Sequence, residues 1–392
     1  MVQPRGAAVG RVAEPVNGDR SVRKVSRSSA AILVGTLAAL SIPTAANADE
    51  LSDGQWYAAF LKLPMAHRVS TGTGVTVAIV DSGVDAHHPA LEGRVISGAD
   101  FSAGGQTSSG DGRTDSNGHG TQMAGLIVGR GKVLGVAPAA KVAPVNALIT
   151  SGTVGSARLA EGIRWAVDHG AKVISLSSAG DDDPLLKQTI EAALTADVVV
   201  VAGVGNTGQD STVRYPAAYS GVIAACGVDR QGKHSSVSVT GPELVLCAPS
   251  DGISSTYPNG RYAIGTGTSE STALIAGAAA LVRAKFPQLS AAEVVHRLTA
   301  TATDKGAPGR DDVYGFGVVN IVDALTKNVP PLTPSAVSSS VSQPSAAETD
   351  EPDGLVNSIQ PWHVALAGVC CLATLALAGG LAGYLIVRRR RR

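Results

Sequence analysis

The sequence contains little charge and few aromatic rings. Only 16% of its 392 residues are charged, and 32 Lys and Arg balance 32 Asp and Glu. Nucleic-acid binding needs an excess of positive charge on one face, so nucleic acid is not an expected partner. The 4 Phe, 3 Trp and 7 Tyr leave little material for stacking bases or sugars. Glycine is abundant at 46 residues but has no fixed period, which excludes a collagen-like chain.

Residues 1–48 have the organisation of an export signal. Basic residues between Arg20 and Arg27 precede an apolar run at residues 30–42, and Ala46-Asn47-Ala48 then fits the small-x-small cleavage rule. The basic stretch contains no Arg-Arg pair, which favours general secretion over the twin-Arg route. The apolar run is short for a membrane span, although an uncleaved anchor remains an alternative.

The C-terminal end predicts a single membrane helix at residues 362–387. Residues 364–387 carry no charge, and 24 residues at ~1.5 Å rise are enough to cross a ~30 Å hydrocarbon core. The basic tail at residues 388–392 is five arginines, which stay on the cytoplasmic side, so the rest of the chain is predicted to be extracytoplasmic. Residues 328–361 are rich in Pro, Ser and acidic residues and are predicted to be a disordered linker. The expected location is therefore the cell membrane.

Between these ends, residues 49–71 form a short extension and residues 72–327 are predicted to form one domain. Apolar strand-like runs alternate there with helical patterns. The predicted strands are residues 75–80, 142–146, 172–176, 198–201, 222–226 and 244–248. The predicted helices are residues 156–169, 184–195, 269–286 and one that opens after Ser290. Strands that are apolar on both faces and alternate with helices indicate an α/β fold with a mostly parallel sheet covered on both faces.

Cys226 and Cys247 are the only cysteines in the predicted exported part. No CxxC spacing suggests a zinc site. Two lone cysteines in an oxidising compartment more often pair than not, and their strands can be neighbours. The sequence therefore predicts a Cys226–Cys247 disulfide.

Four polar residues occupy positions suited to hydrolysis. Asp81 follows the strand at residues 75–80, Asn206 follows that at 198–201, and Ser269 opens a helix after Gly265-Thr266-Gly267. His119 stands between two glycines. Amide hydrolysis needs a nucleophile, a base, a group that orients the base, and donors for the oxyanion. Taken singly, Asp81 and Asn206 equally fit turn formation, and a lone histidine fits a surface position.

The combination of motifs resembles the subtilisin-like serine proteases. The matching segments cover about residues 72–325 and are AIVDSGVD from Ala78, HPAL from His88, NGHGT from Asn117, GVAP from Gly135, GN at Gly205, GTS from Gly267 and YGFG from Tyr314. The chain order Asp, His, Ser is that of subtilisin. The resemblance implies a three-layer subtilisin-like fold, with Ser269 as nucleophile, His119 as base and Asp81 as its partner. It also implies that Asn206 donates to the oxyanion, and that protein or peptide substrates are cut without a required cofactor.

A narrower resemblance is to the mycosins, the subtilisin-like proteases of type VII secretion. They combine an N-terminal signal and a C-terminal membrane helix with a segment similar to Gln55-Trp56-Tyr57 and a loop similar to residues 110–115. Type VII secretion machinery is therefore an expected partner. The stretch between the predicted cleavage site after Ala48 and residue 72 is too short to form a folded pro-domain.

The resemblance further implies a pocket for the residue before the cut. Its walls are Ser175-Leu176-Ser177 and Gly203-Val204-Gly205. Many relatives have glycine in place of Ser177, so Ser177, helped by Val204, is predicted to make the pocket shallow and to favour Ala, Ser or Pro over Phe and Tyr. In the alternative interpretation, the Ser177 side chain points into solvent and does not affect substrate preference.

Two residues depart from the subtilisin-like pattern. Gln122 replaces a second histidine in the His motif, and Glu270 replaces the apolar residue that usually follows the serine. A negative charge at Glu270 stabilises the N-terminus of its helix, but it would oppose catalysis if the side chain turned toward the oxyanion.

The resemblance also raises the question of calcium, since many subtilases bind it. Asp111, Asp115 and residues 181–183 are candidate ligands, with solvated acidic loops as the favoured interpretation.

Three other functions are alternatives to a membrane-anchored endopeptidase. A structural component of a secretion complex with weak or dispensable protease activity is the main alternative, and it would keep its role in Ser269→Ala. A nucleotide-binding domain is disfavoured because no G-x-G-x-x-G opens a helix after the strand at residues 75–80. An α/β-hydrolase is disfavoured because no GxSxG surrounds Ser269.

Overall fold

The computed structural model describes residues 34–37, 48–103, 110–147 and 153–332. The chain divides into two compact units, Met1–Thr333 and Pro334–Arg392, and all of the described residues belong to the first. The predicted membrane helix, basic tail, most of the linker and most of the export signal lie outside the described residues. Within the described residues, no helix has the length and apolar character needed to span a membrane.

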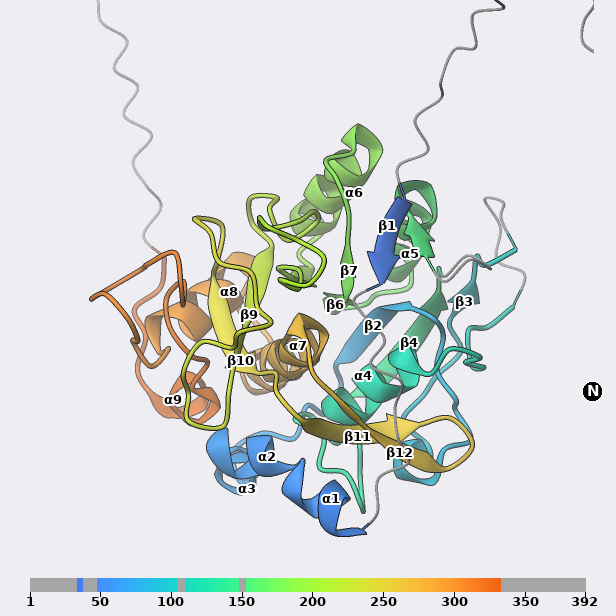
Figure 1. Cartoon of the computed structure of the whole chain (residues 1–392), viewed down its shortest axis with the longest axis horizontal. Coiled ribbons are helices and arrows are strands. Elements are labelled where there is room, and N and C mark those ends of the chain that lie inside the picture. The colour runs from blue at the N-terminus through green and yellow to red at the C-terminus, as the bar shows by residue number, and fades with distance from the viewer. Residues whose placement is uncertain (1–33, 38–47, 104–109, 148–152, 333–392) are drawn as a thin grey trace, which may run out of the picture. The chain divides into compact units, whose positions relative to one another are not determined.

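A parallel sheet of seven strands forms the centre of the first unit (Figure 1). Every neighbouring pair in this sheet is parallel. In spatial order the strands are β10 (Leu246–Pro249), β9 (Ile223–Val228), β8 (Val199–Gly203), β6 (Val173–Leu176), β2 (Thr76–Asp81), β4 (Lys141–Asn146) and β3 (Ala99–Asp100). All six predicted strands are confirmed. The α/β fold follows because successive strand residues are buried on opposite faces of the sheet.

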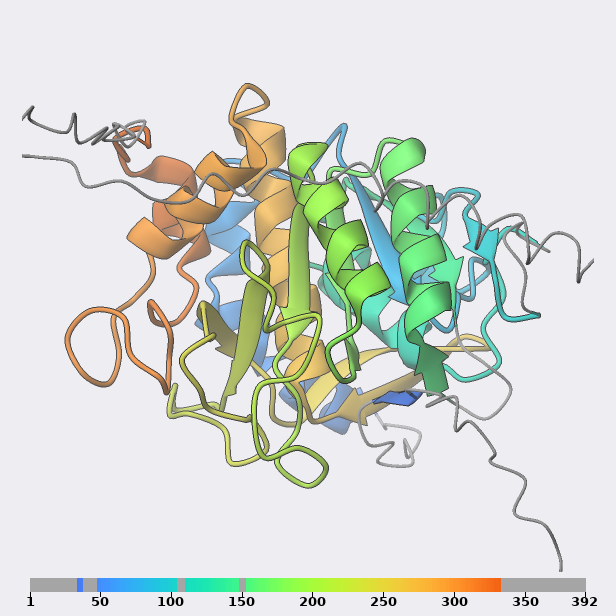
Figure 2. The same cartoon turned by 90° about the horizontal axis from the view of Figure 1, so that it is seen from above.

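Helices cover both faces of the sheet (Figure 2). On one face lie α4 (His119–Val128) and α7 (Thr268–Lys285), and α7 packs against five of the seven strands. On the other lie α5 (Ser156–Asp168) and α6 (Pro184–Thr195). Two separate apolar cores result, one on each face: Ile79 belongs to the first and its neighbour Val80 to the second. These are the three layers expected from the sequence.

Local capping explains where the predicted helices begin. Asp183 accepts a hydrogen bond from the N–H of Leu186 at 2.9 Å, with Pro184 at the first helical position of α6. Ser290 and Glu293 form a complete capping box at the start of α8 (Ala291–Ala300). Helix α9 (Ile321–Thr326) packs with α8 beside α7. The predicted cap positions are therefore confirmed.

The short N-terminal extension packs onto the domain. It contains α1 (Ala48–Asp53), α2 (Trp56–Phe60) and α3 (Leu63–Ala66). Gln55 donates to the carbonyl of Lys132 at 2.7 Å and accepts from the N–H of Leu134 at 2.9 Å. The Tyr57 hydroxyl donates to the carbonyl of Leu134, and its ring is fully buried in the core. The Gln55-Trp56-Tyr57 segment is thus part of the folded body.

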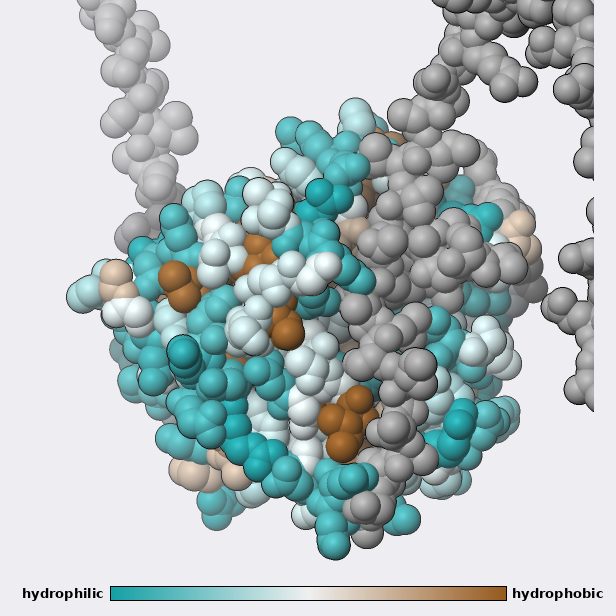
Figure 3. All heavy atoms as spheres, in the orientation of Figure 1, coloured by the Kyte–Doolittle hydropathy of each residue, from teal (hydrophilic) through white to brown (hydrophobic). Residues whose placement is uncertain are grey.

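Two small sheets and several helices, α4 and α9 among them, were not predicted. A hairpin of β11 (Ile253–Tyr257) and β12 (Arg261–Gly265) packs against α4. A three-stranded sheet has the order β5 (Thr153–Gly155), β1 (Val34–Leu37) and β7 (Ser178–Ala179), with antiparallel pairing throughout. A 3₁₀ helix, η1, covers Pro89–Leu91. The surface on the side seen in Figure 3 is mostly polar, with small separate apolar spots.

The predicted disulfide is present. Cys226 and Cys247 are direct partners in the register of the parallel strands β9 and β10. Their sulfur atoms are 1.98 Å apart. The bond therefore joins two neighbouring strands of the central sheet at the edge formed by β10.

Candidate active site

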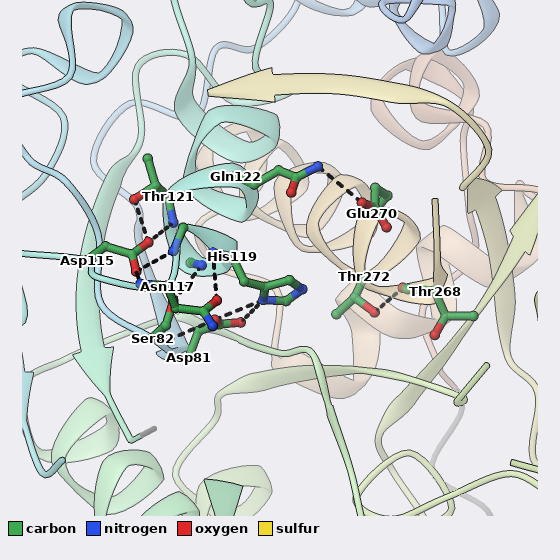
Figure 4. Close-up of polar contacts among 12 residues, drawn as sticks. Asp81, Ser82, Asp115, Asn117, His119, Thr121, Gln122, Thr268, Glu270 and Thr272 are labelled. Carbon is green, nitrogen blue, oxygen red and sulfur yellow. Dashed lines mark hydrogen bonds and ion pairs between the residues drawn. The ribbon is translucent and has the colours of Figure 1, made fainter. Parts of the chain in front are cut away.

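The buried Asp81 and the partly exposed His119 form an ion pair at the carboxyl end of the sheet (Figure 4). Asp81 is the last residue of β2, and its side chain is only 1% exposed. His119 is the first residue of α4, and its Nδ1 lies 2.9 and 2.8 Å from the two carboxylate oxygens of Asp81. An ionised carboxylate can only accept, so Nδ1 carries the proton and Nε2 is left as the nitrogen that can act as a base.

The loop that precedes His119 is held by Asp115. Its carboxylate accepts four hydrogen bonds: from the N–H of Asn117 (3.0 Å) and Gly118 (2.7 Å), and from the N–H (2.9 Å) and hydroxyl (2.6 Å) of Thr121. These bonds fix both ends of the turn from which the imidazole projects. Asp115 is therefore a positioning residue, and the interpretation of it as part of a solvated acidic loop is wrong.

The other candidate calcium ligands also have protein partners. Asp111 accepts from the N–H of Arg113, Asp181 forms an ion pair with Arg214 at 2.6 Å, Asp182 accepts from the Tyr219 hydroxyl, and Asp183 caps α6. Among the residues that the structure describes, no group of three or more His, Cys, Asp or Glu side chains is arranged to hold a metal ion.

Glycine at position 118 is required by close packing. Its φ is +102°, and a Cβ there would lie 2.2 Å from Cε2 of Tyr257. The Tyr257 hydroxyl donates to the carbonyl of Asn117 at 3.1 Å. The β11–β12 hairpin therefore packs against the turn that precedes His119 and fixes the position of this turn.

Neighbouring charges control the imidazole. Burial alone would lower the pKa of His119, but the carboxylate of Asp81 and the nearby carboxyls of Glu270 and Asp115 outweigh it and raise that pKa to about 9. The protein therefore holds the proton on His119 more tightly than a free imidazole would. It becomes available as a base as the pH rises.

Ser269 lies at the start of the buried helix α7, which packs against α4. It is the second residue of the helix, so its N–H is one of the first four that have no partner inside the helix. The positive end of the helix dipole lies at the same place. Within the described residues, no hydrogen bond joins Ser269 Oγ to His119 Nε2, which is common in free enzymes before substrate aligns the groups.

Asn206 is oriented by the residue before Ser269. Its Oδ1 accepts a hydrogen bond from the N–H of Thr268 at 3.0 Å. This fixes the amide so that Nδ2, the donor, is turned to the other side. A Cβ placed on Gly267 would lie 3.4 Å from that Nδ2, so the donor lies next to the turn that leads into Ser269. Thr268 was not singled out from the sequence, although it occupies the middle of the Gly267-Thr268-Ser269 motif.

The predicted pocket walls lie on adjacent strands β6 and β8. Ser175 and Leu176 are in β6, and Ser177 follows it. Ser177 is only 5% exposed beside the β1–β7 pair, so it does not point into solvent. Its Oγ has no hydrogen-bond partner among the described residues.

On the other wall, Gly203 ends β8 and Gly205 has a φ of +102°. The side chain of Val204 is fully buried in the core on the α5 and α6 face. Any contribution of Val204 to a pocket wall must therefore come from its backbone.

The strand edges next to Ser177 accommodate an extended segment. Strand β1 lies between β5 and β7, with Thr36 opposite both Thr153 and Ala179 in the two registers. The gap between β5 and β7 is therefore wide enough for one extended strand, which can pair with both of them.

Comparison with known proteins agrees with this architecture. The model of the subtilase family matches residues 72–317. The chain belongs to the subtilase family. It is a subtilisin-like serine endopeptidase, and it is 39% identical over 278 residues to Subtilisin Savinase from Lederbergia lenta, which covers 69% of this chain and 98% of that protein.

Two solved mycosin structures are also similar to this subtilase. MycP1 with its N-terminal propeptide removed superimposes with a TM-score of 0.62 at 29% identity, covering 70% of this chain and 98% of MycP1. MycP3, described as a protease from the type VII (ESX-3) secretion system, superimposes with a TM-score of 0.62 at 30% identity, covering 76% of this chain and 92% of MycP3. The predicted resemblance to subtilases and mycosins is confirmed.

Proposed function

We propose that this subtilase is a membrane-anchored, extracytoplasmic endopeptidase that cuts protein or peptide substrates with an Asp81-His119-Ser269 triad. The observation that carries the proposal is the pair of short bonds from His119 Nδ1 to Asp81, with the helix that bears Ser269 packed alongside. A histidine held in this way has the correct tautomer to accept a proton at Nε2.

The three residues of the triad and the oxyanion donors have distinct roles in the proposed reaction. Ser269 Oγ attacks the scissile carbonyl while His119 Nε2 takes its proton and then gives it to the leaving amine, so that an acyl-enzyme forms. A water molecule, deprotonated by His119, then attacks the acyl-enzyme in the same way, and Ser269 Oγ leaves and regains its proton as the acid product is released. Asp81 holds and stabilises the imidazolium. Asn206 Nδ2 and the N–H of Ser269 donate to the oxyanion, and the chemistry requires no cofactor.

A fluorophosphonate is expected to label Ser269 alone, because this serine is at the start of α7, which packs against the helix that begins at His119. Mass spectrometry of digested, labelled protein measures the site. Ser271, two residues along the same helix and buried against the carbonyl of Ala248, is an internal control that should stay unlabelled. Labelling of another residue in the native protein would contradict the assignment of the nucleophile.

The proposed membrane anchor is residues 362–387, with the five terminal arginines in the cytoplasm. The similarity to MycP3, a protease from a type VII secretion system, supports association of this chain with such machinery. The positive-inside rule supports the orientation, because five arginines resist translocation.

External protease added to intact cells is expected to release the catalytic domain by cutting within residues 329–361, because this proposed linker has little to bury. Immunoblots of the cell-free supernatant with an antibody against the domain measure the release. An epitope placed after Arg392 is the control and should survive until the cells are lysed. Protection of residues 329–361 in intact cells would refute the orientation.

Ser177→Gly is expected to move specificity toward large residues before the cut. The buried Ser177 side chain lies beside the proposed pocket, and its removal opens one wall. Pocket discrimination by one or two small groups is worth about 1–3 kcal/mol, so the ratio of kcat/KM for matched Phe and Ala peptides should rise about 10-fold or more. Ser178→Gly, at a neighbouring buried serine in β7, is the matched control. An unchanged ratio in Ser177→Gly would show that Ser177 sets no preference.

A further inference from the structure

The two departures from the subtilase pattern contact each other. Gln122 is on α4, three residues after His119, and Glu270 is on α7, directly after Ser269. Gln122 Nε2 donates to Glu270 Oε1 at 3.3 Å (Figure 4). Both side chains are buried, with 7% and 4% exposed. A single polar contact therefore joins the two helices that carry the proposed base and nucleophile.

The chain makes room for this pair at Gly265. A Cβ on Gly265 would lie 2.0 Å from Glu270 Oε1 and 2.3 Å from Gln122 Nε2, so any other residue there would displace the contact. The second carboxyl oxygen, Oε2, lies 3.4 Å from the position of a Cβ on Gly267, the same distance as Asn206 Nδ2. The Glu270 carboxyl and the proposed oxyanion donor thus both lie next to Gly267.

The charged groups around Glu270 come from two other elements. His119 faces it from α4, and Asp251 faces it from the loop after β10, while Asp81 and Asp115 act on His119 in turn. Burial raises the pKa of Glu270 to about 7, against the opposing effect of His119 and with a further rise from Asp251. A carboxyl in this place changes its charge close to neutral pH.

We propose that Glu270, held by Gln122, is a positioning residue that adjusts the rate of amide hydrolysis through its charge. When ionised, it strengthens the hold of His119 on its proton and opposes the negative charge that develops at the oxyanion. When neutral, it does neither and keeps the contact with Gln122. This inference rests on the proposed roles of His119, Ser269 and Asn206.

Glu270→Gln in the full-length protein tests the charge while keeping the shape, because a glutamine oxygen can still accept from Gln122. We expect kcat/KM for a peptide amide at pH 8 to rise about 3- to 10-fold, mainly through kcat, since a neighbouring carboxylate shifts a pKa by about one unit or more. The rise of activity with pH should also move to lower pH. Glu191→Gln, an exposed carboxyl on α6 across the sheet, is the matched control and should change neither. Superimposable pH profiles for Glu270→Gln and the parent would overturn the proposal.

A second measurement does not depend on activity. In the folded protein Glu270 keeps a proton that the unfolded chain, with a pKa of 4.5, has already released, so ionisation of Glu270 makes stability fall as the pH rises from about 4.5 to about 7. In a Ser269→Ala background, the Tm gained by Glu270→Gln should therefore grow between pH 5 and pH 7. A difference in Tm that is constant over this range would overturn the proposal.

Two further outcomes are distinguishable. If the parent neither hydrolyses amides nor reacts with a fluorophosphonate, the proposed function fails, and the pH dependence of Tm still reports on Glu270. If Glu270→Gln does not fold, an NMR titration of His119 in the Ser269→Ala protein decides. Two inflections, one from His119 and one from Glu270, are expected, and a single inflection would refute the coupling.

Discussion

Ser269→Ala is expected to lower kcat for peptide-amide hydrolysis by about 10⁶-fold, the size of loss known for the corresponding residue of subtilisin. The reason is that the Ser269 hydroxyl is the proposed nucleophile at the start of α7, and without it no acyl-enzyme can form. His119→Ala should cost about as much, and Asp81→Ala about 10⁴-fold. Single-turnover and steady-state assays with a chromogenic peptide amide measure these losses.

The three substitutions act on one unit, so their effects should not add. Ser269→Ala combined with His119→Ala should be no slower than Ser269→Ala alone, because the residual rate comes from substrate binding and the oxyanion donors. Thermal unfolding of each variant is the control for folding. A folded Ser269→Ala protein that retains parental kcat would rule out this triad. Retained secretion by cells carrying that variant would instead favour the scaffold function, with the protease activity dispensable.

The sequence predicts the central sheet because its strands bury both faces. A run such as Val198–Val201 is apolar on consecutive positions, and only a strand covered on two sides uses such a run. Asp81 and Asn206 could be placed because residues at the carboxyl ends of parallel strands gather at one edge. The Cys226–Cys247 bond could be predicted because only two cysteines were available in the part predicted to be exported and their strands could be neighbours.

Contacts between distant residues could not be predicted in the same way. The Gln122–Glu270 contact joins residues 148 positions apart, and each residue alone is simply an exception to the family pattern. The four hydrogen bonds to Asp115 depend on the conformation of a turn, whereas the sequence shows only an acidic residue in a glycine-rich loop. The packing of Tyr257 on Gly118 likewise depends on a hairpin whose polar, mixed sequence gives no clear period.

Strand β1 illustrates an ambiguity of short apolar runs. Val34–Leu37 lies within the run that the sequence predicts as part of an export signal, and the structure describes it as a strand paired with β5 and β7. Four apolar or small residues fit either interpretation, since periodicity alone cannot separate them at this length. The export signal therefore stays a prediction from the sequence.

Asn206→Ala is expected to lower kcat by about 10²- to 10³-fold, or about 3–4 kcal/mol of transition-state stabilisation, with little change in KM. The loss falls on kcat because Asn206 Nδ2 meets the oxygen only after the carbonyl becomes tetrahedral. Asn206→Asp is the sharper variant: Asp keeps an oxygen that accepts from the Thr268 N–H at the observed 3.0 Å, so the turn into Ser269 is preserved while the donor is lost. Both variants should still react with a fluorophosphonate at Ser269, although more slowly. If Asn206→Asp keeps parental kcat, Asn206 is not an oxyanion donor and the N–H of Ser269 must act without it.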